Sequence, residues 1–232
     1  MDFLSLCKAT ASDAGTVAGF QSVTTVVGLT GRAAQLVGFV RDAWIDIQNE
    51  RNDWLWMRRR FGPVALTPGD KVYTASDLGV TRLGEWLGDR PGFRTFTIYD
   101  PEQGVAQETE MTQIPYDRWI ERYGRGAHYS QRPTEWSQSP AREILVGATP
   151  DKAHMLSGEY RVSPQVLVAD SDVPEMPDAY HRIIIPRAIR LAASSDEAWP
   201  ALQDKTTQYS ELRSALVREQ TPNIAVGGYP LA

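Results

Sequence analysis

The sequence has little of what marks several common protein classes. It contains one cysteine, Cys7, so no disulfide can form within the chain, and assembly in a reducing cytoplasm is the simple interpretation. No apolar run approaches the ~20 residues that a membrane-spanning helix needs. The first residues, MDFLSLCKATASD, lack the basic start of a secretory signal. We therefore expect neither a disulfide framework nor a membrane anchor.

Positive charge is also scarce. The 232 residues include 24 Lys and Arg against 29 Asp and Glu, which gives a net charge of −5. General affinity for a nucleic-acid backbone needs clustered cations, so this balance argues against a DNA-binding protein. A protein that only surrounds DNA could still be acidic on its inner surface. The length allows one large domain or two small ones.

Motifs for catalysis or metal binding are missing. The sequence contains no phosphate-binding loop, dinucleotide fingerprint, zinc-protease motif, nucleophile elbow or paired cysteines. The three histidines, His128, His154 and His181, lie in separate segments, and Cys7 has apolar neighbours typical of a core residue. We expect no enzyme, no cofactor and no metal. A pair of carboxylates of the glycosidase type stays open, because only their separation in space defines it.

The most distinctive segment is FVRDAWIDIQNERNDWLWMRRRF, residues 39–61. It holds three of the seven tryptophans and five arginines. Apolar residues at helical spacing predict one helix from about Gly31 to Arg60, which Gly62-Pro63 ends. The predicted buried face consists of Leu36, Val40, Ala43, Ile47 and Trp54, widened by Val37, Trp44 and Leu55.

Trp56 falls on the far side of that predicted helix, beside Ile45 and Asn52, about 180° from the buried face. A tryptophan there is exposed, covered by another part of the chain, or buried by a neighbouring copy. Because an exposed tryptophan is disfavoured unless it binds something, we expect these three residues to form an inter-subunit contact.

Arg58, Arg59 and Arg60 end the predicted helix and allow two interpretations. Cations at a helix C-terminus stabilise the helix dipole, which is a purely structural role. The same side chains can contact carboxylates of a partner or DNA phosphate. We retain both, with a partner contact as the functional hypothesis.

The remaining segments alternate between helical and β patterns. A short helix is predicted at residues 2–13 and another at 115–123. The pattern predicts a hairpin around Pro68-Gly69-Asp70 and strands at 93–99, 143–148, 159–162 and 165–169. Helices return at 177–195, where Pro186 kinks or restarts the helix, and after a cap at Ser195 or Asp196, with Pro222 as the stop.

These elements predict an α+β fold. An antiparallel helical bundle, residues 1–61 and 173–220, contains the long tryptophan-rich helix and two C-terminal helices. A mostly-β domain, residues 62–172, is inserted in it. Residues 221–232 form an extended C-terminal tail without helical pattern. Its apolar residues predict a partner-binding arm, with a frayed end as the alternative: Ile224, Val226, Tyr229 and Leu231.

Several segments together resemble the head–tail adaptor proteins of tailed bacteriophages, of the SU10 type. The resemblance begins with Leu6-Cys7, a valine-rich loop and Gly31, and continues through Ala43-Trp44, Ile47-Gln48 and Asp53-Trp54. Phe39 stands where the family pattern has tryptophan. Later segments that resemble the family are YDRWIERYG (116–124), RPTEW (132–136), TPDKAHMLSGEYRVSPQVL (149–167) and MPDAYHRIIIPRAI (176–189).

The resemblance implies a structural virion protein of the head–tail neck, assembled in the host cytoplasm. Such adaptors form a ring of about twelve copies under the portal, extend the DNA channel and present a docking face to the next tail or nozzle protein. DNA passes through without specific binding. The arginines and the tail would then contact the portal. A stopper or tail-completion protein below an adaptor is the alternative, and a tail-associated carbohydrate-active enzyme a weaker one.

Overall fold

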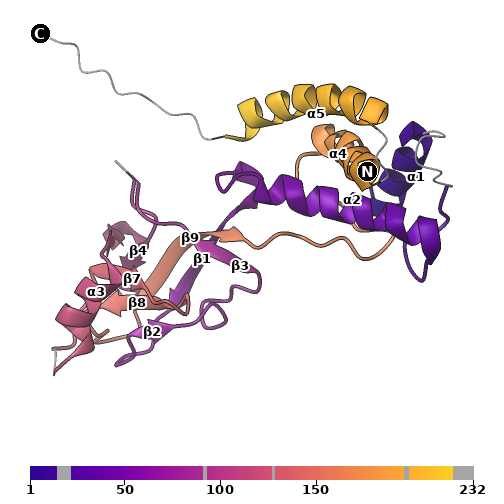
Figure 1. Ribbon diagram of the computed structural model, residues 1–232. Coiled ribbons are helices and arrows are strands. Elements are labelled where there is room, and N and C mark those ends of the chain that lie inside the picture. The colour runs from indigo at the N-terminus through magenta and orange to yellow at the C-terminus, as the bar shows by residue number, and fades with distance from the viewer. Residues whose placement is uncertain (15–21, 91–92, 127–128, 196–198, 222–232) are drawn as a thin grey trace, which may run out of the picture. The chain divides into compact units, whose positions relative to one another are not determined.

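The computed structural model describes residues 1–14, 22–90, 93–126, 129–195 and 199–221 (Figure 1). The chain divides into two units. The helical unit comprises Met1–Met57 and Pro164–Ala232, and the β unit comprises Arg58–Ser163. Helices and two sheets both occur, so the chain has the mixed α+β character that the sequence predicts.

The first helix, α1 (Phe3–Ala14), forms where the sequence predicts it. The Asp2 carboxylate accepts a hydrogen bond from the Ser5 backbone N–H at 2.8 Å and so caps the first turn. The Phe3 N–H donates to the Asp172 carbonyl at 2.7 Å. Helical spacing places the buried residues on one face: Phe3, Leu6, Cys7, Thr10, Ala11 and Ala14.

The second helix, α2 (Gly31–Asn49), buries the face that the periodicity predicts, but it is shorter than expected. Its buried residues are Leu36, Val37, Val40, Ala43, Trp44, Ile47 and Gln48. The prediction that the helix continues to Arg60 is wrong. Residues 49–53, Asn-Glu-Arg-Asn-Asp, offer no apolar side chain to the core, so packing does not hold them in a helix.

Local contacts replace the predicted helical turns after Asn49. The Arg51 guanidinium donates two hydrogen bonds to the Asp53 carboxylate, at 2.8 and 2.7 Å. The Trp54 indole N–H then donates to the Ile47 carbonyl at 3.0 Å, which satisfies an acceptor near the end of α2. The chain continues through a short 3₁₀ turn, η2 (Leu55–Met57), into the first strand.

The C-terminal part of the helical unit contains η5 (Asp178–Ile183), α4 (Ile184–Ser195) and α5 (Trp199–Gln220). Pro186 lies in the first turn of α4, so it starts that helix after the 3₁₀ segment, one of its two predicted roles. α4 packs against α1, α2 and α5, and α5 ends before Pro222 as predicted (Figure 1). The predicted cap at Asp196 lies outside the described residues.

Residues 165–169, predicted as a strand, belong to no strand. Side chains hold this segment instead of a sheet. The Gln165 N–H donates to the Gln48 side chain at 2.7 Å, and the Trp44 indole donates to the Gln165 side chain at 3.2 Å. The Asp172 carboxylate accepts from the Val168 N–H at 2.6 Å. The apolar run is therefore extended and attached to α2.

The β unit contains two sheets. The first has the order β1 (Arg58–Ala65), β9 (Met155–Val162), β4 (Thr97–Tyr99) and β5 (Thr109–Glu110), with β3 (Leu83–Trp86) also on β9. The second has the order β2 (Val72–Tyr73), β8 (Ile144–Gly147), β7 (Glu135–Gln138) and β6 (Thr112–Gln113). A short helix, α3 (Tyr116–Trp119), continues as the π turn η4 (Ile120–Gly124) near the predicted position.

The predicted hairpin around Pro68-Gly69-Asp70 is wrong. A turn is present, since the Asp70 N–H donates to the Thr67 carbonyl at 3.1 Å. However, β1 pairs with β9, and β2 pairs with β8 in the other sheet. The turn therefore leads the chain from one sheet to the other. Which strands pair depends on contacts distant in sequence, and the turn residues do not determine it.

Aromatic rings fill the core of the β unit. The Phe96 and Trp136 rings stack with centroids 3.9 Å apart, and Phe61 meets Phe96 and Trp86 edge to face. Gly158 makes room for this cluster, because a Cβ there would lie 2.6 Å from the Phe61 ring. The cluster gives the small unit a contiguous buried core.

Candidate functional site

The helical unit has a hollowed strip along the edge where α2 and α4 pack. Two adjoining depressions share Asp46 as a lining residue, and we call them together the α2–α4 groove. The apolar depression has a volume of about 340 Å³ and is lined by Phe39, Asp42, Ile45, Asp46 and Leu191. The polar one has about 420 Å³ and is lined by Asp46, Asn49, Glu50, Arg187, Arg190 and Tyr209.

Helix periodicity explains why these residues meet. Positions 39, 42, 45, 46 and 49 of α2 recur at intervals of three or four, so they lie in one row on the helix. Arg187, Arg190 and Leu191 form the matching row on α4. Tyr209 reaches the polar end from α5. The groove is therefore built by regular elements, which hold side chains more rigidly than loops do.

Ion pairs organise the polar end of the groove. The Arg187 guanidinium donates to the Asp46 carboxylate at 2.6 Å. The Glu50 carboxylate accepts from the Tyr209 hydroxyl at 2.7 Å and pairs with Arg213. Two carboxylates thus already have cationic or hydroxyl partners inside the chain.

Tyr209 lies at the centre of these contacts. Burial raises the pKa of Tyr209 above its ordinary value, and its hydrogen bond to the Glu50 carboxylate raises it further. The hydroxyl therefore stays protonated and acts as a donor. The Arg190 guanidinium lies 5.1 Å from the centre of the Tyr209 ring and that of Arg187 lies 5.8 Å from it, both within cation–π range.

Arg190 differs from Arg187 and Arg213 in having no acidic partner among the described residues. Its Nε atom is buried without a hydrogen-bond partner in that part of the chain. Asp46 is paired with Arg187 and Glu50 with Arg213. Arg190 is therefore the cation of this group that lacks an acidic partner among the described residues.

The residues predicted for the inter-subunit contact do not share one helix. Ile45 is half-buried in α2 and lines the groove, and Asn52 is exposed in the turn after α2. Trp56 lies in η2, is 8% exposed, and stacks on Trp54 with ring centroids 4.3 Å apart. Its predicted position on the far face of a helix is wrong, because α2 ends at Asn49. The helical position therefore no longer supports a role of Trp56 between subunits, and that role stays a prediction.

The three consecutive arginines begin strand β1 and do not end a helix, so the helix-dipole interpretation is wrong. Arg58 forms an ion pair with Glu159 on the neighbouring strand β9. Arg60 lies 3.5 Å from Glu108, and Arg59 donates to the Arg58 carbonyl at 2.9 Å. Arg59 and Arg60 are exposed, whereas Arg58 is half-buried. Their contact with a partner stays a prediction.

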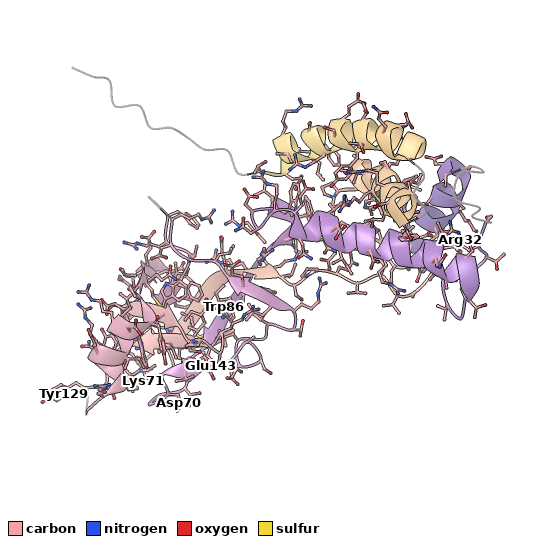
Figure 2. The ribbon with its side chains drawn as sticks, viewed as in Figure 1. Arg32, Asp70, Lys71, Trp86, Tyr129 and Glu143 are labelled. Atoms are coloured by element: carbon pink, nitrogen blue, oxygen red, sulfur yellow. The ribbon has the colours of Figure 1, made fainter. Side chains whose placement is uncertain are left out.

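The loop after η4 presents the most exposed large aromatic residue of the described chain. Tyr129 is 95% exposed and projects from an end of the β unit (Figure 2). Residues 127 and 128, including His128, lie outside the described residues, as do Ile224, Val226, Tyr229 and Leu231 of the tail. The predicted tail contact is therefore untested.

The other candidate residues have structural surroundings. Cys7 is fully buried, as predicted, and burial raises the pKa of its thiol to about 12. The His154 imidazole lies 2.7 Å from the Asp151 carboxylate, and the His181 imidazole 3.0 Å from the Met176 carbonyl. Within the described ranges, no three His, Cys, Asp or Glu side chains are grouped as metal ligands, and no helix is long and apolar enough to cross a membrane.

Sequence reasoning missed the polar end of the groove. The available signals were Asp46 and Glu50 at a spacing of four on α2 and Arg187 and Arg190 at a spacing of three on α4. Neither spacing shows that the two rows face one another, because that depends on how α2 and α4 pack.

Sequence comparison completes the assignment. It places the chain in a class of structural proteins of bacteriophage particles. The chain belongs to the SU10 adaptor protein family, whose model matches residues 1–226. No curated protein matches the chain. The protein is thus a phage adaptor, a virion component that interacts with other proteins of the capsid or tail.

Proposed function

We propose that this chain is a head–tail adaptor that forms a closed ring between the portal and the tail or nozzle. The observation that supports the proposal most is the family match, which extends over residues 1–226. The ring has about twelve copies and extends the DNA channel. The adaptor is assembled in the host cytoplasm and takes no catalytic part.

The proposed architecture is an antiparallel helical bundle with an inserted β domain. In this proposal the helical unit, Met1–Met57 and Pro164–Ala232, forms the ring wall, and the β unit, Arg58–Ser163, is the inserted domain. The packing of α4 against α1, α2 and α5 supports the bundle, and the ring contact uses Ile45, Asn52 and Trp56. The proposed portal contact uses Arg58, Arg59, Arg60 and the tail, residues 221–232.

The net charge of −5 supports a channel role. DNA must slide through a channel without being held, and acidic walls repel phosphate instead of binding it. The packaged DNA is therefore a passing partner and not a bound ligand.

Light scattering of the purified chain, alone and with its cognate portal ring, tests the proposal. We expect a monomer alone and a complex with about one adaptor copy per portal subunit. A chain that ignores the portal but binds a preformed portal–adaptor complex would instead be a stopper or tail-completion protein.

A further inference from the structure

The polar end of the α2–α4 groove has the features of a carboxylate-binding site. Arg190 supplies a positive charge that no described carboxylate neutralises, and its Nε is buried without a hydrogen-bond partner. A buried or half-buried guanidinium is stabilised by an anion, which it binds with paired N–H donors. The cation–π contact with Tyr209 restricts the Arg190 guanidinium to the vicinity of that ring before an anion binds.

The lining of the groove restricts the anion to a protein side chain. Asp46 and Glu50 line the same depression as Arg190 and repel a polyanion such as DNA, whose neighbouring phosphates would approach both carboxylates. A single carboxylate matches the one unpaired guanidinium, that of Arg190. The adjoining apolar depression, with Phe39, Ile45 and Leu191, accommodates uncharged parts of the same polypeptide.

The outer face of α5 presents a suitable carboxylate. Tyr209 and Leu216 of α5 are buried, whereas Glu211 is exposed and two residues, or about 200° of helix rotation, away from Tyr209. Glu211 forms no ion pair or hydrogen bond with any described residue. The helix neighbours of Glu211 are small or uncharged, so another surface can approach it closely: Thr207, Gln208, Ser214 and Ala215.

We propose that Glu211 of one copy binds Arg190 in the α2–α4 groove of the next copy. Groove and carboxylate lie on different faces of the helical unit, so the contact is head-to-tail and can repeat from copy to copy until a ring closes. Ile45 lies beside the bound segment, in agreement with its predicted inter-subunit role. The inference rests on the proposed ring.

Charge-reversal variants test the contact in the portal-bound assembly. Arg190→Glu and Glu211→Arg should each weaken ring formation by about tenfold or more, and the exchange of both charges in one chain should restore much of it. Arg182→Glu and Glu121→Arg, exposed positions outside the groove, are matched controls that should leave ring formation unchanged. Circular dichroism of each variant establishes that it folds.

A cysteine cross-link identifies the two residues directly. A chain with Arg190→Cys is mixed with a chain with Glu211→Cys, assembled on the portal and treated with a bifunctional maleimide. A spacer is needed because an Arg–Glu ion pair between two long side chains holds their Cα atoms further apart than the ~7 Å that a disulfide can bridge. We expect a cross-linked dimer that neither chain forms alone, because buried Cys7 does not compete. A wild-type ring that Arg190→Glu leaves intact, without cross-linking, would overturn this contact alone. Failure of the wild-type chain to form a ring would overturn the proposed function and this contact with it.

Discussion

Replacing Trp56 by alanine distinguishes a residue that stabilises the fold from one that only joins two copies. The side chain is 8% exposed in the single chain and stacks on Trp54 at a ring-centroid distance of 4.3 Å. The chain itself therefore covers most of the indole. We therefore expect Trp56 to stabilise the fold of the single chain, before any second copy binds.

The size of the effect follows from this burial. Removing a buried tryptophan side chain costs about 3–5 kcal/mol in the free energy of unfolding. About 0.5–1.5 kcal/mol of this is the geometric preference of the stacked rings. Trp56→Phe keeps one aromatic ring and should lose a smaller part. With a urea dependence of about 2 kcal/mol per M, Trp56→Ala should lower the urea midpoint by about 1.5–2.5 M.

Urea titration followed by circular dichroism measures the midpoint, at a concentration where light scattering shows a monomer. Asn52→Ala is the matched control, because Asn52 is exposed four residues earlier and should change stability by less than about 0.5 kcal/mol. An unchanged midpoint for Trp56→Ala, together with lost ring formation on the portal, would refute the reasoning. It would show that Trp56 acts between subunits.

Three further predictions concern single groups. Burial raises the pKa of the Cys7 thiol to about 12, so iodoacetamide at pH 8 should label it only after unfolding; rapid labelling of the native chain would contradict its burial. The hydrogen bond from Lys152 lowers the pKa of Asp100, so the stability that it adds is present above about pH 4 and is lost as the pH falls through the lowered pKa. Asp100→Asn should therefore flatten that acid loss in a series of urea titrations, and an unchanged profile would count against the pair. Gln165→Ala removes the acceptor of the Trp44 indole and should cost about 1–3 kcal/mol on thermal unfolding, whereas Tyr129→Ala should cost almost nothing.

Periodicity predicted the buried face of α2 correctly because Leu36, Val40, Ala43 and Ile47 repeat at helical intervals over about three turns. The same periodicity failed beyond Asn49. Trp54 happens to fit the helical stripe, but it reaches the core through a fold-back in which its indole bonds to the Ile47 carbonyl. A pattern of apolar positions does not show whether the chain between them is helical.

The missed strand pairing has a different cause. β1 and β2 are close in sequence, and a local turn connects them, yet each pairs with a strand more than 70 residues further along the chain. Such pairings depend on the side chains of both partners and on the whole sheet. The groove was missed for the same reason, since Asp46 and Arg187 are brought together only by packing.

The pairing of β1 with β9 has a consequence for the chain's construction. Arg58, where the chain enters the β unit, pairs with Arg161, two residues before it leaves. Paired Cα atoms in an antiparallel ladder lie only about 4.5–5.5 Å apart. Once β1 and β9 are paired, the entropy cost of bringing the two segments of the helical unit together no longer depends on the length of the β unit. The helical unit then behaves as if a very short connection joined its two segments. Residues could be added to or removed from the loops of the β unit without changing the gap that the helical unit must span.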